Sequence, residues 1–157
     1  MEYTAIKIKE FDVIISKCDL ERISEHRWFP IRSRPNLIYF GFWTPRPNRK
    51  TIYLHKFLMG NPIDKVVDHI NCNTLDNRRE NLRICAQSEN MRNVKKSEKR
   101  KNPYKGVSFF DLANKWRARI QINKKQIHLG YFNSPEEARD EYINASKKYH
   151  SEFGRVD

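Results

Sequence analysis

An acid, an imidazole and two carboxamides follow one another within a short stretch of the chain. Asp68 and His69 end a short apolar run, Asn81 follows twelve residues after the histidine, and Asn90 lies in a polar helix start. Carboxylate and carboxamide oxygens suit a hard cation such as Mg²⁺ or Mn²⁺. Histidine has the pKa of a base near neutral pH. The pattern therefore predicts one divalent ion and one activated water, the minimum needed to hydrolyse a phosphodiester.

Each residue of this stretch has a candidate role. His69 is the candidate general base, and Asp68 and Asn90 are the candidate metal ligands. Asn81 can orient the imidazole, pin the loop through its amide, or be only a turn residue. Neighbouring residues of a strand point to opposite faces, so Asp68 and His69 require a strand end or an irregular hairpin to serve one site. Three arginines could pair with acids or contact phosphate: Arg78, Arg79 and Arg83.

The charge of the chain indicates a polyanionic partner. The 157 residues carry a formal net charge of +12, with a pI near 9.8. Such an excess of positive charge favours nucleic acid over the alternative of a basic protein at a membrane surface, because no long amphipathic basic helix is visible. The charge is most concentrated in residues 91–101, which hold six Lys or Arg and one Glu. The modest apolar content predicts small cores rather than one large core.

Three widely spaced cysteines, Cys18, Cys72 and Cys85, form no CxxC pair. This argues against a disulfide framework and against a zinc knuckle. No apolar run approaches the ~20 residues of a membrane span, and the first residues do not resemble a signal peptide. The sequence predicts a cytoplasmic protein with no membrane partner and no small-molecule cofactor.

The chain up to about residue 93 reads as short strands followed by a strand–loop–strand–helix unit. Alternating or β-rich runs predict strands at 6–9, 11–15, 36–43, 51–54, 66–70 and 82–84. A short helix is expected at 55–59, closed by Gly60, Asn61 and Pro62. A second helix is expected to begin near residues 86–88. Trp28 is most simply a core residue.

Residues 94–103 have almost no apolar side chain and predict a basic linker that tracks phosphates. Beyond it, strands are expected at 104–110, 115–123 and 126–130, followed by a helix with Ser134 as N-cap and Pro135 at its first position. Ala138, Tyr142, Ala145 and Tyr149 would form the apolar stripe of that helix. The predicted fold is α+β, and its last part is a three-stranded antiparallel sheet packed on one helix.

Such a sheet leaves one face open, and strict alternation places polar side chains there. Arginine and glutamine read base edges, and two- or three-stranded ribbons fit the major groove. The open face is therefore a candidate DNA-reading surface. Together, the linker, this face and the lysines beside it supply the candidate DNA-binding residues Lys95, Lys96, Lys99, Arg100, Lys101, Lys105, Arg117, Arg119, Gln121, Lys124, Gln126 and His128.

Three segments closely resemble the HNH endonucleases of the phage and intron homing type: LHKFLMGNP (54–62), VDHINCNTLDNRRENLRI (66–84) and SENMRN (88–93). The resemblance implies a ββα-metal fold with His69 as general base. It also implies Asp68 and Asn90 as ligands of Mg²⁺ or Mn²⁺, and Asn81 as a residue that supports the site. Asn90 stands where many relatives have histidine. Cys72 stands at a turn position where some have glycine.

The last segment is similar to the ethylene-response-factor (apetala-type) DNA-binding domain, through YKGV (104–107), KWRARI (115–120) and LGYF (129–132). This resemblance implies a sheet laid in the major groove. It adds Ser108, a further candidate DNA-binding residue, and Phe110 to the groove-facing positions. Arg119 and His128 differ in type from the plant proteins, which leaves the target sequence open.

The sequence thus predicts a nuclease domain (1–93, with its ββα-metal core at 54–93), a linker (94–103) and a DNA-binding domain (104–157). The predicted protein is a homing-type endonuclease that acts on double-stranded DNA as a monomer, and one active site per monomer favours a nick. If it is phage-encoded, it works in the cytoplasm of the bacterial host. A non-catalytic DNA-binding regulator with a relic HNH fold is the alternative. An RNA-binding protein is less favoured because paired stacking aromatics are not expected on the open sheet.

Overall fold

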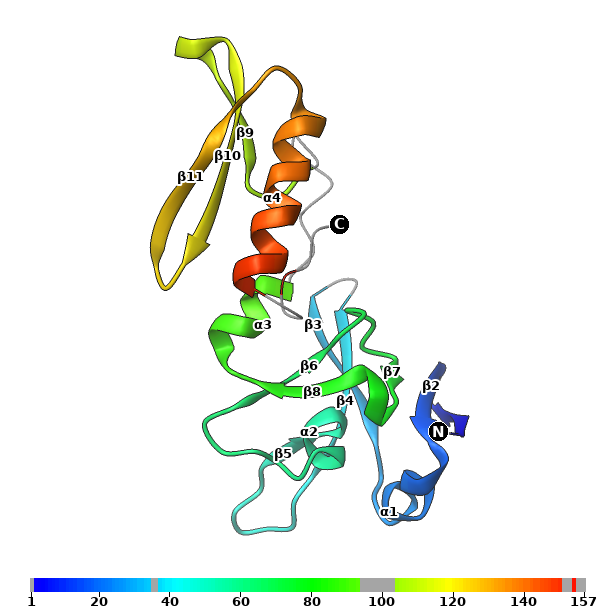
Figure 1. Ribbon diagram of the computed structural model, residues 1–157. Coiled ribbons are helices and arrows are strands. Elements are labelled where there is room, and N and C mark those ends of the chain that lie inside the picture. Colours follow the sequence, from blue (N-terminus) through cyan, green and yellow to red (C-terminus); the bar gives the residue numbers. More distant parts are fainter. Residues whose placement is uncertain (1, 35–36, 94–103, 151–153, 155–157) are drawn as a thin grey trace. The chain divides into compact units, whose positions relative to one another are not determined.

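The computed structural model describes residues 2–34, 37–93, 104–150 and 154. The chain forms two compact units, Met1–Asn90 and Met91–Asp157, and each is described by itself (Figure 1). The predicted linker and its five basic residues, Lys95, Lys96, Lys99, Arg100 and Lys101, lie outside the described residues.

Three small sheets build the first unit. The hairpin β1 (Tyr3–Ile8) and β2 (Phe11–Ser16) is joined on the β2 side by the two-residue strand β7 (Asp76–Asn77), which runs parallel to β2. A second antiparallel sheet has the order β3-β4-β5, with β3 at Phe29–Arg34, β4 at Leu37–Trp43 and β5 at Thr51–Tyr53. A third pairs β6 (Val66–His69) with β8 (Leu82–Cys85) in antiparallel register.

Short helical segments connect these sheets. A 3-10 turn at Lys17–Asp19 leads into α1 (Leu20–Ser24), and α2 (Leu54–Leu58) follows β5 directly. A second 3-10 turn, Arg79–Asn81, precedes β8, and α3 covers Gln87–Asn93. The carboxylate of Glu89 accepts a hydrogen bond from the backbone N–H of Ala86 (2.7 Å), which satisfies one free donor at the start of α3. The order β6, loop, β8, α3 is the predicted strand–loop–strand–helix unit.

One apolar core joins the sheets of the first unit. Its buried members come from β1, β2, α1, β4, α2, β6 and β8: Ile8, Val13, Ile15, Ile23, Phe40, Leu54, Leu58, Val67 and Leu82. Trp28 packs against this core half-buried, as expected, and donates its indole N–H to the Ile23 carbonyl (2.8 Å). Since β6 and β8 each contribute one core residue, the hairpin that bears Asp68 and His69 is fixed to the N-terminal sheets by apolar burial.

The second unit is an antiparallel sheet in the order β11-β10-β9, with α4 packed on one face (Figure 1). The strands are β9 (Val107–Phe110), β10 (Lys115–Ile122) and β11 (Lys125–Phe132), and a 3-10 turn spans Asp111–Ala113. Ser134 accepts a hydrogen bond from the N–H of Glu137 at the start of α4 (Pro135–His150), as an N-cap does. Ala118 and Ile120 meet the helix from the sheet.

The structure differs from the expectations at several points. The strand expected at 104–110 begins only at Val107, and neither α1 nor β7 was expected. Strand β3 was not expected, because Pro30 and three consecutive polar residues weaken its pattern. As an edge strand that pairs only with β4, it tolerates them. Tyr149 is 43% exposed rather than part of the apolar stripe. The last buried position of α4 is His150, whose ring Nε2 lies 3.0 Å from the Gln121 carbonyl oxygen.

A buried ion pair ties the second 3-10 turn to the N-terminal helix. Asp19 is fully buried and accepts hydrogen bonds from Nε and Nη2 of Arg79 (2.8 and 2.6 Å), while Arg22 lies 3.3 Å away. The backbone N–H of Arg79 also donates to the Ser16 hydroxyl (3.0 Å). These bonds hold the end of the loop between β6 and β8 against the scaffold.

Replacing Arg79 by alanine is expected to lower the free energy of unfolding by about 3 kcal/mol, because it leaves the buried Asp19 carboxylate with only longer contacts, to Arg22 (3.3 Å) and to the Cys18 thiol (4.0 Å). Urea unfolding of the full chain measures this change. The matched control is Lys7→Ala, which removes the exposed pair with Asp12 and should cost less than about 1 kcal/mol. Equal losses in the two variants would contradict a structural role for the buried pair.

Candidate active site

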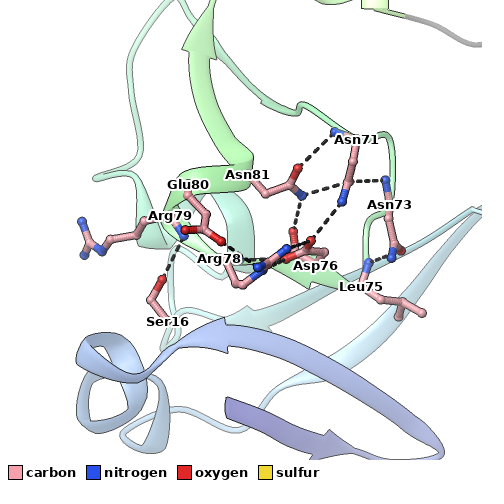
Figure 2. A network of polar contacts seen from close by, with 9 residues as sticks. All are labelled: Ser16, Asn71, Asn73, Leu75, Asp76, Arg78, Arg79, Glu80 and Asn81. Atoms are coloured by element: carbon pink, nitrogen blue, oxygen red, sulfur yellow. Dashed lines mark hydrogen bonds and ion pairs between the residues drawn. The ribbon is translucent and has the colours of Figure 1, made fainter. Parts of the chain in front are cut away.

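The loop between β6 and β8 is held by a network of side-chain amides (Figure 2). Asn81 accepts a hydrogen bond from the backbone N–H of Asn71 (3.0 Å) and donates to the Asn71 side chain (3.0 Å) and the Asp76 carbonyl (2.7 Å). Asn71 in turn donates to the Asp76 carboxylate (2.9 Å). Of the roles considered for Asn81, its bonds correspond to pinning the loop.

Asp76 and Cys72 shape the rest of this loop. The Arg78 guanidinium donates to both oxygens of Asp76, which holds the pKa of that carboxyl below its usual range. Cys72 has φ of +60°, the left-handed region that glycine adopts most readily. A glycine would adopt this turn most readily, and in this chain the position is occupied by Cys72.

His69 is buried and fixed by a residue that the sequence reasoning missed. Its Nε2 lies 3.2 Å from the side-chain oxygen of Asn77. The Asn77 amide nitrogen donates to the Thr74 carbonyl (2.9 Å), so its oxygen must face the imidazole. An amide oxygen only accepts, and His69 therefore carries its proton on Nε2 and its basic lone pair on Nδ1. A signal existed in the sequence, since Asn77 lies in the stretch LDNR, but nothing distinguished it from the other asparagines.

Two aromatic side chains flank this imidazole. The ring centroids of His55 and Tyr39 lie 5.2 and 6.3 Å from that of His69. Burial lowers the pKa of His69, although Asn77, Asp68 and Asp76 oppose this shift. Burial lowers the pKa of His55 further, to about 3, and the neighbouring His69 and Lys56 add to the effect. Burial and the charge of Asp68 raise the pKa of Tyr39. The cluster thus holds two neutral imidazoles at neutral pH.

Asp68 precedes His69 on β6 and lies directly opposite Arg83 on β8. Its Oδ2 accepts hydrogen bonds from Nε and Nη2 of Arg83 (3.0 and 2.8 Å). His69 is the last residue of β6. A strand end is one of the two arrangements expected to let the neighbours Asp68 and His69 serve one site. Asn90 lies on α3. Burial raises the pKa of the Cys85 thiol, the charge of Asp68 adds to this shift, and Arg83 and the backbone amide of Asn90 oppose it.

The donor set fits a hard divalent cation by its chemistry. Asp68 offers a carboxylate oxygen and Asn90 a carboxamide oxygen, and Mg²⁺ keeps waters and phosphate oxygens for its remaining positions. Arg83 would share Asp68 with such an ion. Over residues 2–34, 37–93 and 104–150, no three His, Cys, Asp or Glu side chains gather as a metal cluster. A metal site here would therefore have few protein ligands.

The open face of the second unit brings most of the remaining predicted residues together. The register pairs Arg119 with His128 and Gln121 with Gln126 across β10 and β11. Arg119 donates to the Gln126 side chain (2.8 Å), and Lys124 lies in the turn with φ of +66°. The predicted contacts Ser108 and Arg117 lie directly opposite each other. Lys105 instead donates its Nζ proton to the Arg92 carbonyl oxygen, so its ammonium is engaged with backbone.

Aromatic side chains also lie on this face: Phe110 was expected there, but a stacking partner for it was not. Phe110 and Tyr131 stack with centroids 5.5 Å apart, the Arg117 guanidinium lies 4.7 Å from the Phe110 ring, and His128 contacts Tyr131 at 4.6 Å. Alternation within one strand did not reveal this group, because it depends on how β9 and β11 flank β10. The face therefore combines arginine, amide and aromatic groups.

Comparison with known proteins gives one match. Residues 60–92 match the family model described as HNH endonuclease, and this span includes Asp68, His69, Asn77, Asn81 and Asn90. The match supports an HNH nuclease, a class of DNA-hydrolysing enzymes that generally use divalent metal ions. No curated protein and no solved structure matches the chain. None of the described helices has the length and apolar character needed to cross a bilayer.

The low pKa of His55 predicts a pH dependence of stability. Unfolded His55 gains a proton near pH 6.5, whereas the folded residue resists protonation down to about pH 3. The contribution of the neutral His55 to the free energy of unfolding is complete above pH 6.5 and is lost as the pH falls from 6.5 towards 3. In urea unfolding between pH 6 and pH 4, wild type should lose stability more steeply than His55→Asn, by up to about 1.4 kcal/mol per pH unit. Parallel slopes would contradict the burial of a neutral imidazole.

Proposed function

We propose that this chain is a divalent-metal-dependent DNA endonuclease in which His69 is the general base. The observation that carries the proposal is the buried imidazole that Asn77 holds in one tautomer beside Asp68. The family match over residues 60–92 supports the same reaction class. Asp68 and Asn90 hold Mg²⁺ or Mn²⁺, and Asn81 maintains the loop that supports the site.

The chain's own groups divide the work of phosphodiester hydrolysis. His69, neutral at physiological pH, accepts the proton of the attacking water at Nδ1, while Asn77 holds the ring in place through Nε2. When bound, the divalent ion stabilises the charge on the phosphate and on the leaving oxygen. Arg83 positions the Asp68 carboxylate by its two hydrogen bonds.

The second unit supplies sequence recognition in this proposal. Its open face, with Arg119, Gln121, Gln126 and His128, enters the major groove of double-stranded DNA, and the basic residues 95–101 track phosphates. The enzyme is of the homing type with a ββα-metal core, acts as a monomer in the cytoplasm, and nicks one strand per binding event. It needs no small-molecule cofactor and no membrane.

His69→Ala is expected to reduce cleavage by about 10²- to 10⁴-fold, because the water loses its base. The assay is conversion of supercoiled plasmid in Mg²⁺ or Mn²⁺, with chelator as the blank, and DNA binding in chelator should be unchanged. Asn77→Ala should cut about 10- to 100-fold more slowly, since the His69 imidazole is still present as the base but is no longer held in its orientation. Asn144→Ala, an exposed asparagine on α4, is the matched control and should cut like wild type. Undiminished cleavage by His69→Ala would reject the base assignment.

Arg119→Ala is expected to lose a base-edge contact. The difference in binding free energy between the preferred base and other bases at one position of the bound site should therefore fall by about 1–3 kcal/mol. Lys124→Ala should weaken all sequences alike and lower the salt slope of binding by about 1, since a phosphate contact is lost. Binding selection on randomised duplexes measures both. Equal effects of the two variants on preferred and unrelated sequences would contradict this division of roles.

A further inference from the structure

A long segment of the first unit contains no acidic residue. Residues 26–63 hold seven Lys or Arg and no Asp or Glu. Three of the seven, Arg46, Arg49 and Lys50, lie exposed in the loop between β4 and β5. Among the described residues, no carboxylate pairs with any of these three. Five of the seven lie in β3 or in the loop between β4 and β5.

The register of this sheet separates a buried face from a partly open one. Ile38, Phe40 and Phe42 alternate on the face of β4 that meets the apolar core and the aromatic cluster around Trp28. Tyr39, Gly41 and Trp43 therefore lie on the other face. Directly opposite residues share a face, which adds neighbours from β3 and β5: Phe29, Ile31, Thr51 and Tyr53. We call this surface the β4 platform.

One end of the β4 platform meets the candidate active site. The Tyr39 ring lies 6.3 Å from His69 and 6.1 Å from Tyr53, measured between centroids. Tyr53 in turn lies 5.7 Å from His55. All these side chains are at least partly buried, and they make a continuous aromatic surface from β4 to the imidazole of His69.

The other end is exposed, aromatic and basic. Trp43 is 53% exposed, its ring lies 4.2 Å from that of Phe29, and the Arg49 guanidinium stands 3.9 Å from its centroid. The loop that bears Arg49 has a defined shape, since the Thr44 hydroxyl donates to the Asn48 carbonyl (3.1 Å) and accepts from the Lys50 N–H (2.8 Å). Arginine and exposed tryptophan are typical of surfaces that hold nucleic acid.

We infer that the β4 platform binds the DNA flank next to the scissile phosphate, with Arg46, Arg49 and Lys50 on the phosphates and Trp43 against the exposed edge of the strand. This inference rests on the proposed function. Tyr39 and Trp43 are separated by four residues of β4, about 13 Å. At 3.4 Å per base pair, this corresponds to about four base pairs from the cut. The first unit thus holds its own stretch of duplex, independently of the open face on the second unit.

The test is the salt dependence of binding to a mixed-sequence DNA duplex, measured in chelator so that no cleavage is needed. Arg46→Ala/Arg49→Ala should bind about tenfold or more weakly, and the slope of log affinity against log salt should fall by about 2, because two phosphate contacts are lost. The control Lys9→Ala/Lys147→Ala removes the same charge from exposed sites elsewhere and should keep the wild-type slope. Equal slopes for the two double variants would overturn the inference.

A second measurement reports on Trp43 directly. The chain has three tryptophans. Adding the duplex should quench tryptophan fluorescence in wild type and in Trp116→Phe, and most of this quenching should disappear in Trp43→Phe. Persistent quenching in Trp43→Phe would overturn the inference, as would equal binding of an RNA duplex with the same dependence on Arg46 and Arg49. The salt slope could respond as expected although neither the wild type nor any variant cuts DNA. That result would reject the proposed nuclease function and still support DNA binding by the β4 platform.

Discussion

The side-chain amide of Asn81 is the point on which the candidate site depends. Its three hydrogen bonds close the loop between β6 and β8 on itself, while Leu75 of the same loop packs against the apolar core. With the loop closed, Asp76 and Asn77 pair with β2 as a two-residue strand. That pairing brings the Asn77 oxygen to His69. A polar loop is thus ordered by amide groups that satisfy one another, each worth only about 1 kcal/mol net but acting as one network.

Burial then determines the chemistry of the imidazoles. His55 and His69 lie edge to face in a site lined by Tyr39, and the removal of water disfavours the charged form of both. The acids near His69 oppose this shift but do not reverse it. A neutral imidazole with a defined tautomer is a competent proton acceptor without further activation. The N-terminal sheets have a function beyond scaffolding, because Tyr39 and His55 both come from that part of the chain.

The two units share one architectural principle. Each presents a sheet with one face buried and the other carrying arginine and aromatic side chains, as with Trp43 and Arg49 in the first unit and Phe110 and Arg117 in the second. A buried face gives the sheet its rigidity, and rigidity fixes the spacing of the groups on the open face. Two such surfaces in one chain would divide DNA contact between the neighbourhood of the cut and a separate stretch of sequence.

The sequence alone determined the elements and the candidate chemistry, because alternation, caps and turn residues act over a few positions. The apolar and polar faces of β10, the N-cap Ser134, and the adjacent pair Asp68 and His69 could all be read from neighbouring residues. Only the tertiary structure decided which asparagine reaches the imidazole, since Asn77 comes to His69 through pairing with β2, more than sixty residues earlier in the chain. The same holds for strand β3 with its proline, for the stacked Phe110 and Tyr131, and for the bond between Arg83 and Asp68. Each depends on register between strands, which is set by packing across the whole unit and not by local sequence.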